Sequence, residues 1–204
     1  MGKLFVISAP SGTGKTSLIE SALADPNSSK TRVGISCTTR EKRPKEKHGV
    51  SYFFISQQEF INKINRNEFL EYAEVFGNLY GTPKDWVLSV LEEGKNVILE
   101  LDIQGALQVK EAFPEAKTIF IIPPSYEDLS NRLKKRAQDP PEEIKTRLKE
   151  ARKEVGIGKD FDQIIVNNDF DKALDDLKKF IFLNDMPSTE RKEESKISLN
   201  LLLD

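Results

Sequence analysis

The sequence has little cysteine, little histidine and no long apolar run. Cys37 is the only cysteine among 204 residues, which excludes an internal disulfide and argues against a zinc cluster. His48 is the only histidine and lies in a charged loop, so a histidine-based hydrolase has no support. No stretch approaches the apolar length that crosses a bilayer, so we expect no membrane partner.

The chain also lacks an excess of charge of either sign. It carries 31 basic and 33 acidic residues, and this balance gives no global attraction to nucleic acid or to an anionic surface. We therefore expect no nucleic-acid partner and look for binding sites locally. The N-terminus runs into an apolar segment rather than a cleavable signal, so the cytoplasm is the expected compartment.

A glycine-rich segment between an apolar run at 4–7 and a helix-like stretch at 17–23 predicts a phosphate-binding loop. Its two glycines allow backbone angles that aim successive N–H groups inward, and the following helix adds its positive dipole end. The lysine can reach terminal phosphates, and the threonine hydroxyl can hold Mg²⁺. Alanine stands where this motif usually begins with glycine. The segment reads Ala9, Pro10, Ser11, Gly12, Thr13, Gly14, Lys15 and Thr16.

Short β-rich runs at 4–7, 97–101, 118–122 and 163–166 alternate with helix-period segments. This alternation predicts an α/β fold with a parallel sheet core and helices on both faces. Helix starts are predicted at Ser56–Glu59 and Ser125–Asp128, which resemble capping boxes, and at Thr82-Pro83. The length suits one such domain carrying small inserts.

Three segments differ from this alternating pattern of strands and helices. Residues 31–82 read as a small mixed β insert with strands at 52–55 and 69–76. Residues 126–159 read as a mobile flap of charged helices. From residue 184 the chain becomes polar and predicts a flexible tail, whose apolar end at 197–203 packs either against the body or against a partner subunit. A homo-oligomer is therefore one of the two alternatives that the sequence leaves open.

Two further groups suggest ligand binding. Arg40 and Arg43, with Tyr52 downstream, can clamp a phosphate through charge-assisted hydrogen bonds, although a solvated basic loop would look the same. Glu100 and Asp102 are alternate residues at the end of a buried strand, so both point toward the crevice where α/β proteins bind ligands.

Several separate blocks of the chain, in order, resemble the guanylate kinase family, and the resemblance covers nearly all of residues 3–183. It implies a P-loop nucleoside monophosphate kinase that transfers a phosphoryl group reversibly from ATP to GMP, and also to dGMP, in purine metabolism. It further implies a domain at 3–184, with a core at 3–35, 83–124 and 160–184, a mixed α/β GMP-binding insert at 36–82 and a helical lid at 125–159. The tail is then 185–204. The matching blocks lie at 8–16, 36–52, 68–71, 77–82, 100–105, 123–125, 132–136 and 165–169.

The resemblance implies the acceptor site residue by residue. The GMP phosphate would be held by Arg40, Arg43, Tyr52 and Tyr80. Glu71 would accept hydrogen bonds from guanine N1 and N2, which suits a carboxylate because it is an acceptor only. Ser36 and Thr82 would donate to the O6 side, and Glu100 would add an acceptor near N2. Many members have aspartate at the position of Glu100, so this sequence departs from the family pattern there.

The resemblance also implies the donor site. ATP would bind along Ala9 to Thr16, with Arg132 and Arg136 from the lid and with Asn168 near the adenine. Lys15, Arg40, Arg136 and Arg147 would stabilise the transferring phosphoryl group. Mg²⁺ would be held by Thr16 and, through water, by Asp102. Lid closure would exclude water and so prevent ATP hydrolysis.

Three other functions are compatible with parts of the pattern. A catalytically inactive scaffold would bind a partner without forming ADP, although Lys15, Thr16 and Arg40 argue against it. A kinase for another phosphorylated acceptor would lack the guanine-reading set of Glu71, Ser36 and Thr82. A P-loop switch or motor would hydrolyse the triphosphate without any acceptor.

Overall fold

The computed structural model describes residues 1–75, 77–136, 140–183, 185 and 187–204. The chain forms two compact units: the first comprises Met1–Val6 and Lys30–Lys117, and the second comprises Ile7–Ser29 and Thr118–Asp204. Strand β1 (Leu4–Ser8) spans the boundary in the sequence between these units.

The main sheet has five strands in the order β2-β7-β1-β8-β9. In the first unit β2 (Thr31–Val33) pairs in parallel with β7 (Asn96–Glu100). In the second, β8 (Lys117–Ile122) pairs in parallel with β9 (Gln163–Val166). Val97, Ile98 and Leu99 of β7 and Ile119 to Ile122 of β8 are buried, as expected for a parallel sheet covered by helices. The predicted α/β class with a parallel sheet core is confirmed.

The first unit also holds a second, four-stranded sheet with the order β4-β3-β6-β5. Strands β3 and β4 run parallel, whereas β3–β6 and β5–β6 are antiparallel, so the sheet is mixed. Phe76, which the sequence predicts at the end of a strand, lies outside the described residues. The strands are β3 (Cys37–Thr38), β4 (Phe53–Phe54), β5 (Phe69–Val75) and β6 (Asn78–Pro83).

Helix α2 (Gln57–Asn65) covers one face of this second sheet. It begins as predicted, because the Ser56 hydroxyl accepts a hydrogen bond from the Glu59 N–H at 3.2 Å. Phe60 packs against Phe69, with ring centroids 4.5 Å apart, and beside the buried Cys37. This small apolar cluster gives the insert its own core.

Helices α3 (Lys84–Glu92) and α4 (Ile103–Ala112) complete the first unit. The N-cap of α3 is Pro83, so the prediction that Thr82 caps this helix is wrong. The Thr82 hydroxyl instead bonds a carboxylate in the neighbouring strand. The N-cap of α4 is Asp102, whose Oδ1 accepts from the Gly105 N–H at 2.8 Å.

In the second unit α1 (Lys15–Leu23) follows β1, and a 3₁₀ turn follows at Pro26–Lys30. Helices α5 (Tyr126–Arg136) and α6 (Pro141–Gly158) occupy the predicted lid segment. They pack through a cluster of buried side chains, and α5 begins with the predicted cap, since the Ser125 hydroxyl accepts from the Asp128 N–H at 3.0 Å. The cluster consists of Leu129, Leu133, Ile144 and Ala151.

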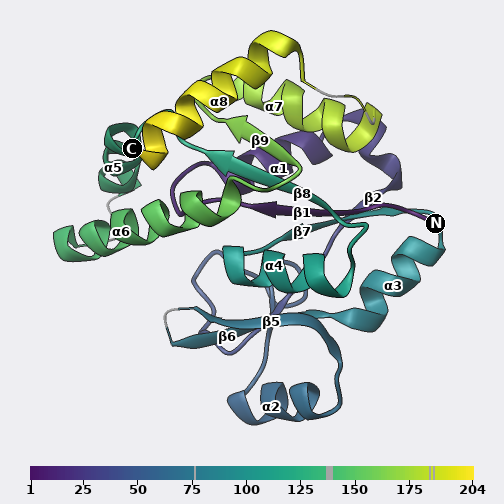
Figure 1. Cartoon of the computed structure of the whole chain (residues 1–204). Helices are drawn as coiled ribbons and strands as arrows, with labels where there is room; N and C mark the ends of the chain where they lie inside the picture. Colours follow the sequence, from purple (N-terminus) through teal and green to yellow (C-terminus); the bar gives the residue numbers. More distant parts are fainter. Residues whose placement is uncertain (76, 137–139, 184, 186) are drawn as a thin grey trace. The chain divides into compact units, whose positions relative to one another are not determined.

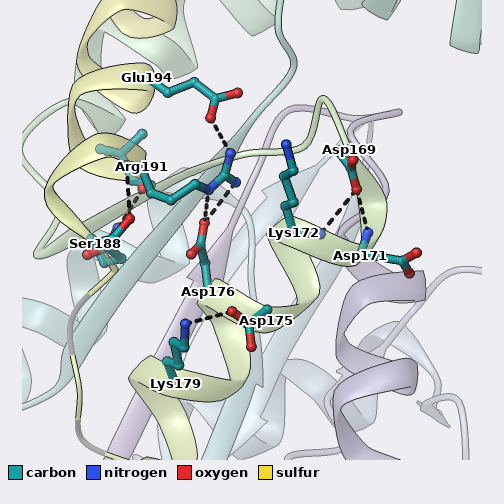
Figure 2. Close-up of polar contacts among 11 residues, drawn as sticks. Asp169, Asp171, Lys172, Asp175, Asp176, Lys179, Ser188, Arg191 and Glu194 are labelled. Atoms are coloured by element: carbon teal, nitrogen blue, oxygen red, sulfur yellow. Dashed lines mark hydrogen bonds and ion pairs between the residues drawn. The ribbon is translucent and has the colours of Figure 1, made fainter.

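The last three helical elements are α7 (Phe170–Lys178), a π-helical turn at Lys179–Leu183, and α8 (Thr189–Leu203), which lies beside α7 in Figure 1. Residues 189–203 form helix α8, whereas the sequence predicts a flexible tail over residues 185–204. Figure 2 shows why it is held: Arg191 Nε donates to Asp176 Oδ2 of α7 at 2.8 Å, and Arg191 also pairs with Glu194.

The apolar end of α8 contributes to the same attachment. Leu202 is buried, and its carbonyl accepts a hydrogen bond from the Tyr126 hydroxyl at 2.9 Å. Ile197 and Leu201 remain exposed. Of the two explanations left open by the sequence, packing on the body therefore accounts for Leu202. Across the described parts of the chain, no helix is both long and apolar enough to traverse a bilayer.

Candidate active site

The predicted site residues fall into two clusters, one in each unit. The phosphate-binding loop, Arg132, Arg147 and Asn168 belong to the second unit. All of the predicted acceptor residues, from Ser36 to Glu100, belong to the first unit, and so does Asp102, which was predicted to hold Mg²⁺ through water. Each cluster is built from its own local contacts.

The glycine-rich loop has the backbone conformation that its sequence predicts. Gly12 and Gly14 have φ of 95° and 93°, which side chains rarely tolerate. The Thr13 hydroxyl turns back onto the Pro10 carbonyl at 2.9 Å, and Gly14 is the N-cap of α1. The loop therefore leads directly into a helix N-terminus, where backbone N–H groups favour an anion.

A second-unit loop supports this one from the side. Asn167 is buried, and its Nδ2 donates to the Thr13 carbonyl at 2.6 Å. Arg132 Nη2 donates to the Asn167 carbonyl at 2.7 Å, and Nη1 donates to the Thr13 carbonyl at 3.3 Å. Arg132 thus lies at the loop where it was predicted, and its guanidinium donates to backbone carbonyls of the loop and of Asn167. Asn168, the predicted adenine neighbour, is the exposed residue that follows Asn167.

Helix α6, in the segment predicted to form the lid, also contacts the loop. Arg147 Nη1 donates to the Ser11 hydroxyl at 2.9 Å, and Nη2 pairs with Glu143 Oε1 at 2.7 Å. A guanidinium is therefore placed beside the loop that is predicted to hold phosphates. Arg136 is the last residue of α5, and its side chain lies outside the described part of the structure.

Lys15 is the first residue of α1, and Thr16 follows it with an exposed side chain. In the described residues no group of three or more His, Cys, Asp or Glu side chains could hold a metal ion by itself. A single hydroxyl at the loop nonetheless suits Mg²⁺, which takes few protein oxygens and completes its shell with phosphate oxygens and water. The residues present therefore fit this ion as a partner of a polyphosphate.

In the first unit a chain of hydroxyl groups leads to a buried carboxylate. The Thr82 hydroxyl donates to Glu71 Oε1 at 2.6 Å, and the Ser36 hydroxyl lies 3.3 Å from that of Thr82. Glu71 is only 3% exposed, so its carboxylate is shielded from solvent. Burial raises the pKa of Glu71 to about 7, with the Thr82 hydrogen bond opposing and the nearby Asp102 charge adding to the rise.

A β-bulge directs Glu71 to this face of the sheet. Phe69 lies opposite Pro83 and Glu71 lies opposite Thr82, so two steps along β5 match one step along β6. Side chains directly opposite each other share a face, and Thr82 and Pro83 point to opposite faces. Phe69 therefore packs toward α2, whereas Glu71 faces the side of Ser36 and Thr82.

The predicted phosphate clamp centres on Arg40. Its Nε donates to the Tyr80 hydroxyl at 3.2 Å, and its guanidinium carbon lies 5.6 Å from the centre of the Tyr52 ring. Its Nη2 pairs with Glu46 Oε1 at 2.7 Å, and this hydrogen bond raises the pKa of Arg40. Arg43 adds its backbone N–H to Glu46 Oε2 at 2.8 Å, and its side chain is exposed.

Tyr52, Glu100 and Asp102 are the other predicted residues of the first unit. Burial, followed by the charge of Glu100, raises the pKa of Tyr52 to about 12, so its phenol stays protonated and can donate. Glu100 ends β7 with a half-buried side chain. Asp102 uses one carboxylate oxygen to cap α4.

Three further residues belong to these clusters but were not predicted as site residues. Glu46 bridges Arg40 and Arg43, and Gly105 and Gln108 of α4 lie against β5. Gly105 and Gln108 depend on contacts between distant segments, for which the sequence carries no local signal. Glu46 lies only three to six positions from its partners, in a segment whose basic residues drew the prediction instead.

Comparison with known proteins gives a consistent result. A family model described as guanylate kinase matches residues 1–184. The chain is 52% identical over 177 residues to a guanylate kinase of Hahella chejuensis, covering 87% of this chain and 84% of that one. It is 44% identical over 202 residues to a guanylate kinase of Escherichia coli K12, covering 99% and 98%. The crystal structure of guanylate kinase from Anaplasma phagocytophilum superposes with a TM-score of 0.73 at 32% identity, covering 93% of this chain and 89% of that one.

Proposed function

Because the chain belongs to the guanylate kinase family, we propose that its two clusters divide the ATP-dependent phosphorylation of GMP between them. The glycine-rich loop of the second unit binds the phosphates of ATP. The face of the second sheet that carries Glu71 binds GMP. The products are ADP and GDP, and the reaction is reversible.

The observation that carries the acceptor assignment is the buried chain from Ser36 through Thr82 to Glu71. An ionised carboxylate can accept from both N1–H and the 2-amino group of guanine. Adenine offers no such pair of donors on that edge and would leave the buried carboxylate unsatisfied. A site built on hydrogen bonds rejects such an analogue strongly, because unpaired buried polar groups are costly.

The phosphate of GMP is assigned to Arg40, Arg43, Tyr52 and Tyr80. Arg40 supports this assignment because its guanidinium already binds one carboxylate oxygen of Glu46, and a phosphate oxygen can take the same place. All of the residues assigned to the GMP site are proposed to contact the base or the phosphate. We therefore extend the proposal to dGMP, which differs only at the ribose.

In the transfer step an oxygen of the GMP phosphate attacks the γ-phosphorus of ATP, and the bond to the β–γ bridging oxygen breaks. Negative charge spreads over the moving group, so the protein contributes by positioning and by positive charge. Lys15, Arg40, Arg136 and Arg147 supply that charge in this proposal. Arg147 has support from its hydrogen bond to Ser11 of the loop.

Mg²⁺ bound with ATP would neutralise charge on the β- and γ-phosphates. Thr16 is proposed to hold it directly and Asp102 through water. Closure of α5 and α6 over ATP is proposed to exclude water from the site. The cytoplasm, which supplies both nucleotides, remains the proposed compartment.

The test is a coupled ADP-release assay that offers GMP, AMP, CMP and UMP in parallel. We expect turnover with GMP and little with the other three. Glu71→Gln should weaken the use of GMP far more than that of ATP, because its amide presents a donor to guanine donors. Lys15→Met should cripple kcat while the fold survives.

Specific results would contradict the proposal. Equal losses for GMP and ATP in Glu71→Gln would remove Glu71 from base recognition. Unchanged kcat in Lys15→Met would remove Lys15 from the mechanism. Rapid ADP formation without any acceptor would favour a nucleotide-hydrolysing switch.

A further inference from the structure

The outer edge of the second sheet is held by one side chain from a helix. Strand β5 lies at the end of the order β4-β3-β6-β5, so one side of its backbone has no partner strand in this sheet. On that side Gln108 of α4 accepts from the Tyr72 N–H at 3.2 Å and donates to the Tyr72 carbonyl at 2.8 Å. The amide thus bonds both backbone groups of one residue, as a neighbouring strand would.

The residue held in this way follows Glu71 directly. One turn earlier on the same face of α4 lies Gly105, and a Cβ atom placed there would come within 2.7 Å of Glu71 Oε2. Glu71 Oε2 therefore lies against bare helix backbone, while Oε1 accepts from Thr82. The carboxylate has contacts on both of its oxygens, and α4 supplies one of them.

The bulge between Phe69 and Glu71 makes this attachment important. A bulge leaves the ladder locally disrupted, and a shift of one residue turns every following side chain to the other face. Glu71 is the first residue after the irregularity, so its direction depends on what fixes Tyr72. On the inner side Tyr72 is paired with Gly81, and on the outer side it is bonded by Gln108.

We infer that Gln108 is a positioning residue for guanine recognition. It does not contact the nucleotide; it fixes the backbone at Tyr72 so that Glu71 presents its carboxylate beside Thr82 and Ser36. Gly105 leaves the space into which that carboxylate fits. The inference rests on the proposed role of Glu71 in reading guanine.

The experiment compares Gln108→Leu, which keeps the size of the side chain and removes both hydrogen bonds, with Gln104→Leu. Gln104 is an exposed glutamine on the same helix and serves as the matched control. Steady-state kinetics give KM for GMP and for ATP. Inosine monophosphate, which lacks the 2-amino group, measures how well the carboxylate reads guanine.

For Gln108→Leu we expect KM for GMP to rise about tenfold, because the two hydrogen bonds that fix the Tyr72 backbone are lost and Glu71 is no longer held in place. KM for ATP should stay within about twofold of its original value. The preference for GMP over inosine monophosphate should fall about fivefold or more, since a displaced carboxylate no longer reaches both donors. Gln104→Leu should match the unmodified protein in all three measurements.

Equal behaviour of the two leucine variants would overturn the inference, as would equal losses for GMP and ATP. If Gln108→Leu does not fold, Gly105→Ala decides, because its methyl group displaces Glu71 Oε2 and should produce the same selective loss. Unchanged GMP preference in Gly105→Ala would then overturn the inference. Glu71→Gln separates the two levels: if it also leaves the preference unchanged, the proposed guanine readout itself fails.

Discussion

At the scale of single residues, the buried carboxylate of Glu71 combines two demands that oppose each other. Burial strengthens its hydrogen bonds but disfavours its charge, and the pKa of Glu71 rises to about 7. In the free protein near neutral pH, part of the population is therefore protonated. A protonated carboxyl cannot accept from both guanine donors.

This predicts a pH dependence of GMP binding. Below pH 7 binding must release a proton from Glu71, so affinity weakens as the pH falls, by about tenfold between pH 8 and pH 6. Titration calorimetry in buffers of different ionisation enthalpy measures both the affinity and the released proton. Asp102 is the nearby acidic group whose charge adds to the rise in the pKa of Glu71.

Glu71→Gln is the control for that measurement. It lacks the titrating group, whereas the phosphate of GMP still titrates as before. The difference between the two pH profiles isolates Glu71. Parallel profiles would show that this carboxyl is already ionised throughout the range.

At the scale of elements, the phosphate-binding loop and its helix form the part that the sequence predicts best. Gly12 and Gly14 indicate positive φ, and both have it. The capping residues Ser56 and Ser125 also begin their helices as predicted. These features are local, because each depends on residues within a few positions of one another.

Gly14 offers a test at this scale. Gly14→Ala adds a side chain at a φ of 93° and places its Cβ 2.6 Å from Asn167 Nδ2. We expect the free energy of unfolding to fall by about 1–3 kcal/mol and KM for ATP to rise, with a smaller change for GMP. Chemical denaturation and steady-state kinetics measure the two effects.

Gly156→Ala is the matched control for stability. Gly156 lies inside α6 with open space around its Cβ position, so alanine should stabilise the protein by up to about 1 kcal/mol. Similar losses in both variants would mean that conformational strain at the loop is not the cause. Loss only in Gly14→Ala supports the loop geometry.

What the sequence could not predict at this scale depends on contacts between distant segments. Alternation along β5 puts Phe69 and Glu71 on one face, and only the bulge separates them. Thr82 followed by proline looks like a helix cap, whereas its hydroxyl finds a better acceptor in the partner strand. Tertiary contacts decided both cases, and neither contact is visible in a local pattern.

At the scale of the whole molecule, the α/β class and the order of the segments followed from the alternation of strands and helices. The C-terminal segment did not, because its composition is polar and charged, as in flexible tails. Arg191 attaches this segment to the rest of the second unit as helix α8, because it pairs with Asp176 of α7. Its partner Asp176 is 6% exposed, and burial raises the pKa of Asp176 while Arg191 counteracts the rise.

We therefore predict that Arg191→Met destabilises the protein by about 1–3 kcal/mol, since it leaves the carboxyl of Asp176 buried without its cation. The effect should be smaller than for a fully buried pair, because the Arg191 side chain keeps 14% exposure. Urea unfolding followed by circular dichroism measures it. Lys196→Met is the control, because Lys196 and Glu193 pair at 69% and 60% exposure. Equal midpoints for the two variants would refute this account of how α8 is attached.

The bulge in β5 also matters to anyone who redesigns the acceptor pocket. Removing one residue there would regularise the strand and place a neighbouring side chain where the Glu71 carboxylate now lies, with no other residue of the chain changed. Backbone length in this strand is thus a design variable in its own right. Libraries that vary only side-chain identity would never sample it.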